Sequence, residues 1–365
     1  MIRKPLLLTP GPLTTDIAVR RAMLDDWGSR DPAFIALTAE LRQRLVDVAN
    51  GSASHVAVPI QGSGTYVLEA AVDTLIGPED RLLVAINGAY GERMAAIAGR
   101  LGHTVETMVW DENQAVAPAM LANRLEANPA ITHVAVVHCE TTTGLLNPLE
   151  DIARVVSEAG RHLIVDAMSS FGALPIDLRA LRATAILASS NKCLEGTPGL
   201  AFALIDRAVL EACAGRSRST TLDLHAQWRG FEKDGQWRFT PPVQVVAALV
   251  EALRLLEAEG GPTARLERYS ANLSVLLDGA ASLGLELFLD PSLQAPIIVT
   301  FRSPPGLDFE GFYAALAEEG FLIYPGKLTR EASFRIGCIG AVTSDDFIRL
   351  MSVLGPALAG HVAAA

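Results

Sequence analysis

Unbroken apolar runs of strand length alternate with helical patterns through the first two thirds of this 365-residue chain. Runs without polar alternation are typical of strands that are buried on both faces of a sheet. Helices between consecutive strands favour a mainly parallel sheet that is covered on both sides. The sequence therefore predicts an α/β fold with a seven-stranded sheet. The strands are expected at residues 55–59, 81–86, 104–110, 133–138, 162–166, 185–189 and 199–205, and the helices at 66–76, 91–101, 117–127 and 149–159.

The alternation ends near residue 243. Two long helical patterns follow, and Gly260, Gly261 and Pro262 break the chain between them. Shorter elements then predict a smaller α+β domain. We divide the chain into an N-terminal segment (1–20), a large domain (21–258) and a small C-terminal domain (259–365). The elements expected here are helices at 243–259, 263–283, 309–318 and 344–358, a strand at 297–301 and short strands near 322 and 334.

Composition argues against several classes of function. The net charge is −11 and no basic stripe offsets it, which argues against a nucleic-acid partner. No apolar run approaches the ~18 residues that cross a bilayer, and the apolar run near the N-terminus is too short for a signal peptide. We expect a reduced cytoplasmic protein without disulfides, a metal site or a membrane span. The cysteines, which form no CxxC pair, are Cys139, Cys193, Cys213 and Cys338.

Lys192 is one of only four lysines, against twenty-six arginines, and it follows the apolar stretch from Thr184 to Ser190. Glycine and proline break the chain at 196–199, before the next apolar run. This pattern places the ammonium group at the mouth of a buried strand. Burial lowers the pKa of a lysine and makes its neutral amine accessible, as Schiff-base chemistry requires. The alternative is a structural lysine paired with a carboxylate.

Asp166 closes the apolar run that precedes the Lys192 strand. A carboxylate at a buried strand end needs a cation or a hydrogen-bond donor. Ligands of open parallel sheets bind beyond the carboxyl ends of the strands, so Asp166 and Lys192 can converge there. One interpretation is a direct ion pair. The other places pyridoxal phosphate between them, because its ring nitrogen must keep a proton and its aldehyde needs an amine.

Two loops after earlier strands suit the same cofactor. Gln61-Gly-Ser-Gly-Thr65 lies directly before a helix, whose free N–H groups and added hydroxyls suit a phosphate, although a plain N-cap also explains it. It is neither a P-loop nor a GxGxxG motif. Tyr90, in Asn87-Gly-Ala-Tyr-Gly91, can stack on a planar ring; the alternative is a surface tyrosine in a turn.

Two further motifs offer ligands for the ring and the substrate. Glu140-Thr141-Thr142-Thr143-Gly144 presents hydroxyls that can hold a ring oxygen or a phosphate, whereas His138 with Glu140 is too few ligands for a metal. Arg335 lies inside an apolar strand pattern and needs an anionic partner. That partner is either a substrate carboxylate or phosphonate, or a carboxylate of the protein itself.

With these residues in place, the chain resembles the class V, fold type I, pyridoxal-phosphate-dependent aminotransferases over nearly its whole length. Within them it is most similar to the 2-aminoethylphosphonate–pyruvate transaminases. The most specific of the matching motifs are the three consecutive threonines, Thr141 to Thr143, and the string that begins at Gln236. The matching strings are Leu6-Leu-Leu-Thr-Pro-Gly-Pro-Leu-Thr-Thr15, Asp26-Trp-Gly-Ser-Arg-Asp31, His138-Cys-Glu-Thr-Thr-Thr-Gly144, Ser189-Ser-Asn-Lys-Cys193 and Gln236-Trp-Arg-Phe-Thr-Pro-Pro242.

The resemblance implies roles for individual residues. Lys192 carries the cofactor and shuttles a proton, Asp166 holds the proton of the ring nitrogen, and Tyr90 stacks on the ring. Arg335 clamps the carboxylate of pyruvate or alanine, and also the phosphonate. The N-terminal segment lies near the active site. The resemblance further assigns the phosphate to Ser63, Gly64, Thr65 and Asn191, ring substituents to Thr141 or Thr142, and the phosphate of a neighbouring subunit in an obligate homodimer to Thr240.

The implied reaction moves the amino group of 2-aminoethylphosphonate to pyruvate and gives phosphonoacetaldehyde and L-alanine. Glu195-Gly-Thr197 departs from the Gln-Gly-Val expected there, and we expect it to add a negative charge near the anionic substrate. An alanine–glyoxylate or serine–pyruvate aminotransferase is the nearest alternative. A non-catalytic protein that keeps the cofactor fold and an NAD-type Rossmann protein also stay open. Lys327-Leu-Thr-Arg330 has no cysteine, which argues against a cysteine desulfurase.

Overall fold

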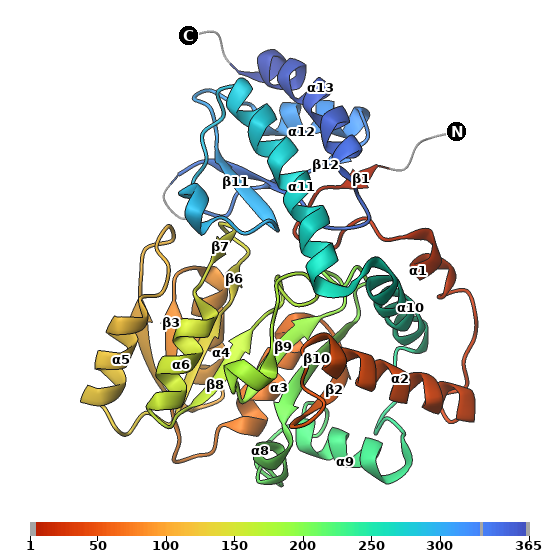
Figure 1. The fold of residues 1–365 in the computed structure, drawn as a ribbon, viewed down its shortest axis with the longest axis vertical. Helices are drawn as coiled ribbons and strands as arrows, with labels where there is room; N and C mark the ends of the chain where they lie inside the picture. The colour runs from red at the N-terminus through yellow and green to blue at the C-terminus, as the bar shows by residue number, and fades with distance from the viewer. Residues whose placement is uncertain (1–4, 329–330, 363–365) are drawn as a thin grey trace.

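A seven-stranded sheet forms the centre of the larger part of the molecule (Figure 1). The computed structural model describes residues 5–328 and 331–362. The strand order is β2-β10-β9-β8-β5-β3-β4, and every neighbouring pair is parallel except those that β10 makes with β2 and β9. The predicted mainly parallel sheet is confirmed. The strands are β2 (His55–Gln61), β3 (Arg81–Ile86), β4 (Thr104–Val109), β5 (His133–Val137), β8 (His162–Asp166), β9 (Ala185–Ser189) and β10 (Leu200–Asp206).

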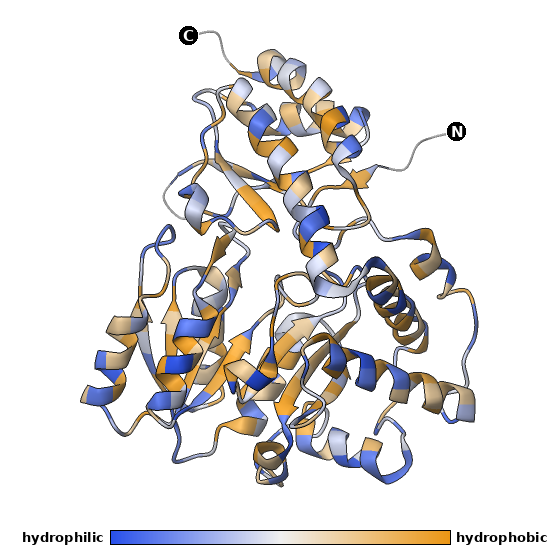
Figure 2. Cartoon of the chain, in the orientation of Figure 1, coloured by the Kyte–Doolittle hydropathy of each residue, from blue (hydrophilic) through white to orange (hydrophobic). Residues whose placement is uncertain are grey.

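Successive residues of each strand point to opposite faces of the sheet, and each face has its own apolar core. Leu83 packs in one core, whereas its neighbours Leu82 and Val84 pack in the other. Figure 2 shows the strands in orange between helices that carry blue residues. The first core is covered by α2 (Pro32–Val48), α5 (Pro118–Ala127), α6 (Leu149–Glu158) and α10 (Val243–Glu259), and the second by α3 (Gly64–Leu75), α4 (Ala89–Arg100), α8 (Arg207–Glu211) and α9 (Leu224–Asp234).

Two of these covering helices were not expected from the sequence. We assigned no element to the segments that form α2 and α9. Asp31 caps α2 by accepting a hydrogen bond from Ala33 N–H, and a proline follows it, which is a strong helix-start pattern. Helix α9 is short and largely polar, and it ends at Gly235 in the left-handed region. The remaining short helices of the large part are α1 (Ile17–Arg21) and α7 (Leu178–Leu181).

The C-terminal part is a small α+β unit with its own apolar core. Its antiparallel sheet has the order β11-β14-β13. None of the described helices is both long enough and apolar enough to span a bilayer. The elements of this part are α11 (Gly261–Ser282), the 3-10 helix η1 (Pro291–Leu293), β11 (Ile298–Arg302), α12 (Phe309–Glu318), β12 (Phe321–Leu322), β13 (Tyr324–Pro325), β14 (Ser333–Gly337) and α13 (Ser344–His361).

The start of the chain connects the two parts. Strand β1 (Leu6–Leu7) pairs in parallel with β12 of the small unit. Gly11 then lies against the loop that carries Lys192: a Cβ added there would be 2.8 Å from Asn191 O and 3.2 Å from Lys192 Cγ. Its φ of +126° adds backbone strain for any other residue. The N-terminal segment therefore packs directly on the lysine loop.

Candidate active site

Asp166 and Lys192 lie at the carboxyl edge of the large sheet. Asp166 is the last residue of β8, and Lys192 follows the adjacent parallel strand β9. Among the residues that the structure describes, no ion pair joins them, although their charges attract each other. The interpretation of a direct Asp166–Lys192 ion pair is therefore wrong.

The Lys192 amine lies among hydroxyl groups. Its Nζ donates to Ser169 Oγ at 2.8 Å and to Thr141 Oγ1 at 3.3 Å, and these two oxygens are 2.5 Å apart. Burial lowers the pKa of Lys192, and the nearby charge of Asp166 acts in the opposite direction. A lowered pKa makes the neutral amine available as a nucleophile or base.

The Asp166 carboxylate is buried and accepts a hydrogen bond from Met168 N–H at 2.9 Å. Burial raises its pKa, whereas that hydrogen bond and the charges of Lys192 and Arg93 lower it. A buried carboxylate of this kind is stabilised by a cation with an N–H group beside it. The position therefore suits a protonated ring nitrogen.

Tyr90 is the second residue of α4, and its ring faces the lysine. The Lys192 Nζ lies 5.4 Å from the ring centroid, and the guanidinium carbon of Arg93 lies 4.8 Å from it. The interpretation of Tyr90 as a surface tyrosine in a turn is wrong. An aromatic face beside the amine can stack on a planar ligand ring.

Ser63, Gly64 and Thr65 form the amino end of α3. Ser63 stands at the N-cap, yet its side chain makes no capping hydrogen bond with any described residue, so a plain N-cap does not explain the motif. A Cβ added at Gly64 would lie 2.6 Å from Met168 Sδ, which leaves no room for a side chain. Because Met168 also binds Asp166, the helix end and the carboxylate are adjacent. First-turn N–H groups and hydroxyls together can bind a phosphate.

The structure separates the roles of the two threonines. Thr141 Oγ1 contacts the lysine amine, whereas Thr142 donates its hydroxyl to Glu140 Oε1 at 2.8 Å. Glu140 is fully buried, and it also accepts from the N–H groups of Thr142 and Tyr90 at 3.2 and 3.3 Å. Burial raises the pKa of Glu140. Glu140 therefore holds the Tyr90 backbone and the threonine loop together.

Arg335 lies in β14 and only 2% of it is exposed. It donates from Nε to Pro325 O at 3.0 Å and from Nη1 to Thr141 O at 3.1 Å. No carboxylate of the described chain forms an ion pair with it, so the interpretation of an intramolecular salt bridge is wrong. Burial lowers its pKa, whereas the nearby Tyr90, Tyr324 and Glu140 act in the opposite direction. Because Arg335 also touches the Thr141 loop, an anion bound by it lies at the lysine site.

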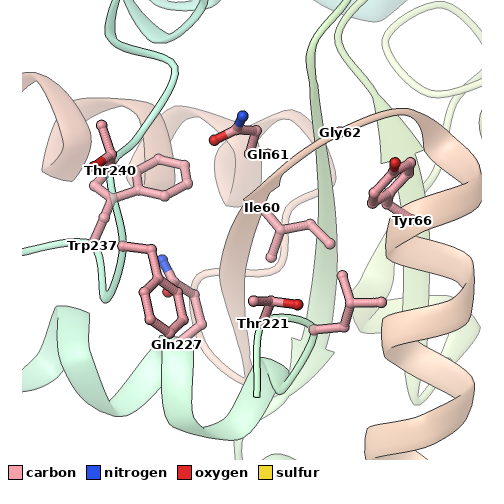
Figure 3. Close-up of a pocket in the computed structure, with 10 residues that line it drawn as sticks. Ile60, Gln61, Gly62, Tyr66, Thr221, Gln227, Trp237 and Thr240 are labelled. Carbon is pink, nitrogen blue, oxygen red and sulfur yellow. The ribbon is translucent and has the colours of Figure 1, made fainter. Parts of the chain in front are cut away.

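Thr240 does not join this cluster within one chain. It lies on the exposed loop before α10 and lines a cavity of about 330 Å³ together with Gly62 and Tyr66. Figure 3 shows Thr240 and Tyr66 on opposite sides of that cavity, with Ile60 between them. The cavity therefore connects Thr240 to the loop that precedes the α3 amino end.

The expected negative charge of Glu195 beside the substrate is not observed, and this expectation was wrong. Its carboxylate turns towards α11, where it accepts from Arg268 Nη2 at 2.9 Å and from Tyr269 OH at 2.5 Å. Arg265 Nη2 lies 3.8 Å from its second oxygen. The charge of Glu195 is therefore balanced by arginines of the small unit.

Ser169 and Met168 contact site residues, and we assigned neither of them to the site from the sequence. Glu140 stood in the threonine motif, but we gave it no role of its own. Ser169 is three residues past Asp166, in the turn that follows β8. A polar pair, Ser169-Ser170, directly after a buried strand was a usable pattern, because loops at the carboxyl edge line the ligand site. Met168 carried no such pattern, since its role depends on packing against Gly64.

The chain matches the family model for aminotransferase class V over residues 28–337. The chain belongs to the class V aminotransferases. It is 51% identical over 347 residues to the 2-aminoethylphosphonate–pyruvate transaminase of Pseudomonas putida strain GB-1. The matched region covers 94% of each chain. The resemblance seen in the motifs is thereby confirmed.

Solved structures of other aminotransferases share this fold. The ureidoglycine–glyoxylate aminotransferase of Bacillus subtilis superposes with a TM-score of 0.91 at 27% identity, over 99% of this chain and 94% of the other. The alanine–glyoxylate aminotransferase of Nostoc sp. superposes with a TM-score of 0.90 at 28% identity, over 98% and 96%.

As a class V aminotransferase, the protein uses pyridoxal phosphate, and the residues present fit that cofactor. The uncapped amino end of α3, closed to a side chain at Gly64, suits the phosphate group. The buried Asp166 suits the ring nitrogen, and the Lys192 amine with its lowered pKa suits the aldehyde. These three features lie on one edge of the sheet, as a single planar ligand requires.

Proposed function

We propose that this enzyme transfers the amino group of 2-aminoethylphosphonate to pyruvate, giving phosphonoacetaldehyde and L-alanine. The observation that carries this choice of substrates is the 51% identity to a 2-aminoethylphosphonate–pyruvate transaminase across 94% of both chains. The geometry supports it, because Arg335 offers a buried guanidinium without a carboxylate partner among the described residues. Carboxylate and phosphonate both present the oxygens that this planar group binds.

When bound, pyridoxal phosphate supplies an aldehyde that receives the amino group and a ring that withdraws electrons. In this proposal Lys192 removes the proton from the carbon that bears the substrate amine, as a general base. Its lowered pKa and its hydrogen bonds to Ser169 and Thr141 support that role. Asp166 keeps the ring nitrogen protonated, and Tyr90 supports the ring face. Ser63, Gly64, Thr65 and Asn191 hold the phosphate group.

A donor screen tests the proposed substrates. Purified enzyme loaded with pyridoxal phosphate is given pyruvate and one amino donor, and L-alanine is measured by a coupled assay. We expect 2-aminoethylphosphonate to give kcat/KM at least about tenfold above that of L-serine. A higher value for L-serine would contradict the proposed donor while leaving the aminotransferase class intact.

An alanine–glyoxylate aminotransferase is the second candidate, because the Nostoc enzyme shares the fold with a TM-score of 0.90. Its identity to this chain is 28%, against 51% for the Pseudomonas putida enzyme. The same assay with L-alanine and glyoxylate, with glycine as the measured product, distinguishes the two. We expect glyoxylate to be the poorer acceptor.

We also propose that the active enzyme is a homodimer in which Thr240 reaches the phosphate group of the neighbouring subunit. The support is its position on the cavity of Figure 3, where Tyr66 and Phe239 are 54% and 50% exposed. Large apolar side chains at such exposure are typical of protein interfaces. Sedimentation should give about twice the chain mass of 38.8 kDa, and a monomer would contradict this proposal.

The proposed division into residues 1–20, 21–258 and 259–365 assigns cofactor binding to the middle part. It is supported by the packing of α10 on α2 and of α11 on α13, on either side of Gly260. We place the enzyme in the cytoplasm, because its four cysteines are free and buried.

A further inference from the structure

A network of charged side chains joins the loop after Lys192 to the loop after β14. It comprises Glu195 of the first loop, Glu259 at the end of α10, and Arg265, Arg268 and Tyr269 of α11. We propose that Glu195 is a positioning residue, which sets the Lys192 amine relative to the Arg335 guanidinium by tying both loops to α11. This inference rests on the proposed roles of Lys192 and Arg335.

Glu195 is held directly to the lysine loop. Its N–H donates to Lys192 O at 2.8 Å, and Gly196 N–H donates to Ser190 O at 2.8 Å. The backbone therefore forms a tight turn around the lysine. Glu195 has a φ of +59°, in the left-handed region that a residue with a Cβ occupies at a cost. The side-chain contacts of Glu195 therefore have to hold this strained turn in place.

Side chains of α11, in the small unit, bind the loop that carries Lys192. Glu195 accepts from Arg268 and Tyr269, and Arg265 donates from Nη1 to Cys193 O at 2.8 Å. Cys193 and Glu195 flank Leu194, just after the lysine. The backbone and the carboxylate of the lysine loop are thus both bound by one helix of the other unit.

The same residues hold the loop that follows Arg335. Arg268 donates from Nη1 to Gly340 O at 2.6 Å and to Val342 O at 3.2 Å. Tyr269 accepts from Gly340 N–H at 3.3 Å while it donates to Glu195. Strand β14, with Arg335, ends three residues before Gly340. One tyrosine hydroxyl therefore lies between the loop that carries Lys192 and the loop that follows the Arg335 strand.

The formal charges of the network balance, with two carboxylates and two guanidinium groups. Glu259 accepts from Arg265 at 2.6 and 2.8 Å and from Arg268 at 2.8 Å. Arg265 is 2% exposed and Glu195 is 6% exposed, so removing one carboxylate leaves the two guanidinium groups to share the carboxylate of the network that remains. Loss of Glu195 removes the side-chain contacts of the lysine loop itself, whereas loss of Glu259 leaves the contacts of Glu195 with Arg268 and Tyr269 in place.

Glu259 is therefore the matched control for Glu195. Both carboxylates bind Arg268 and lie near Arg265, but the hydrogen bonds of Glu259 run to these arginines rather than to the lysine loop. If Glu195 serves only stability, Glu195→Ala and Glu259→Ala should lower the unfolding temperature and change nothing else. If Glu195 positions Lys192, its variant alone should change the catalytic centre.

The experiment compares purified holoenzymes of wild type, Glu195→Ala, Glu195→Gln and Glu259→Ala. We expect Glu195→Ala to lower kcat/KM for pyruvate by about 10²-fold, because a displacement of about 1 Å is sufficient for that loss. Glu195→Gln keeps an oxygen that accepts from Tyr269, and it should recover most of the activity. Glu259→Ala should stay within about threefold of wild type. Equal losses in Glu195→Ala and Glu259→Ala would overturn the proposal.

A second readout needs no substrate and so separates this proposal from the choice of donor. The visible absorption of the bound cofactor is titrated against pH, since its midpoint reports on the group joined to Lys192. Without the Glu195 side chain, the turn around Lys192 loses its contacts with Arg268 and Tyr269. The midpoint should therefore move away from the wild-type value, and further than in Glu259→Ala, where those contacts remain. An unchanged midpoint would overturn the positioning role even if the enzyme preferred another donor.

Should Glu195→Ala fail to fold, Tyr269→Phe decides the question. It removes only the hydroxyl that joins Glu195 to Gly340, and the ring keeps its packing. We expect kcat/KM for pyruvate to fall by about fivefold, the value of one hydrogen bond between the loops. Wild-type values for both kcat/KM and the absorption midpoint would overturn the proposal.

Discussion

Arg335 and Arg265 are equally buried, with 2% of each residue exposed, but they have different partners. Arg265 binds Glu259 at 2.6 Å, lies 3.8 Å from Glu195 and donates to Cys193 O. Arg335 donates to two backbone carbonyls, and the described chain supplies no carboxylate for it. A buried guanidinium that the protein neutralises stabilises the structure, whereas one that it leaves uncompensated is available to an anionic ligand.

The same contrast separates the lysine site from the network on α11. Asp166 and Lys192 lie close enough to attract each other but form no ion pair, and both pKa values are shifted towards neutral forms by burial. In the network, carboxylates and arginines are paired, and the pKa of Glu259 is lowered by Arg268 and Arg265 despite its burial. Uncompensated groups therefore gather at the proposed site of the cofactor and substrate.

Lys192→Ala gives the largest effect that we predict. It removes the amine that we propose both to join the cofactor and to act as the general base, so turnover should fall by about 10⁴-fold or more. The measurement is alanine formation by the purified variant, together with the visible absorption of the bound cofactor. Folding should be unaffected, because the amine is bound by two hydroxyls rather than by a carboxylate. Turnover near the wild-type rate would refute the role of Lys192.

Arg265→Met should produce the largest loss of stability. The apolar side chain has similar length, but it leaves Glu259 and Glu195 to share Arg268 as the arginine that still binds both of them. Breaking a buried network in this way costs about 3–5 kcal/mol of unfolding free energy. Urea unfolding of the variant and of wild type measures the difference. A variant as stable as wild type would mean that the ion pairs on α11 contribute no net stability.

Arg335→Met makes the same substitution at an equally buried arginine, but we expect the opposite pattern of effects on stability and activity. It should leave the free energy of unfolding unchanged or raise it, because it removes a buried charge that the protein does not neutralise. In contrast, kcat/KM for pyruvate should fall by about 10²-fold, through loss of a charged hydrogen-bonded pair with the carboxylate. Strong destabilisation with normal kcat/KM would show that Arg335 is structural, and the contrast with Arg265 would fail.

The smallest predicted effect is on the free energy of unfolding at acid pH, and it concerns a buried histidine whose one ring nitrogen lacks a hydrogen-bond partner in the described part of the chain. His138 is buried and its Nδ1 has no partner among the described residues; burial lowers its pKa to about 4 from an ordinary 6.5. The unfolded chain therefore takes up the proton first, so stability is full above about pH 6.5 and is lost as pH falls towards about 4.

At about pH 5.5 this single group should cost about 1.4 kcal/mol. Replacing His138 by leucine should reduce the difference in unfolding free energy between neutral pH and pH 5.5, measured with urea, by that amount. His133, whose pKa is also lowered to about 4, stays in both proteins, so its contribution to the pH dependence cancels in the comparison. An identical pH dependence in His138→Leu and wild type would contradict the assignment.

Most of the fold could be predicted from periodicity, because strands buried on both faces leave unbroken apolar runs. Strands β3, β8 and β9 have the predicted bounds, and α10 and α12 do as well. Helix α2 was missed although Asp31-Pro32 marks its start. The antiparallel direction of β10 was not predicted, since its apolar run reads the same in either direction along the chain.

The chemistry of the site was also readable in part. Charged residues at the ends of apolar runs are costly, so Asp166, Lys192 and Arg335 stood out without any knowledge of their neighbours. What each of them meets was beyond the sequence. The partners of Glu195 are more than seventy residues away along the chain, and they reach it because α11 packs on the lysine loop. The local sequence determines which secondary structure a residue favours and whether it is buried. Whether its charge is neutralised depends on contacts that form only when distant segments of the chain fold together.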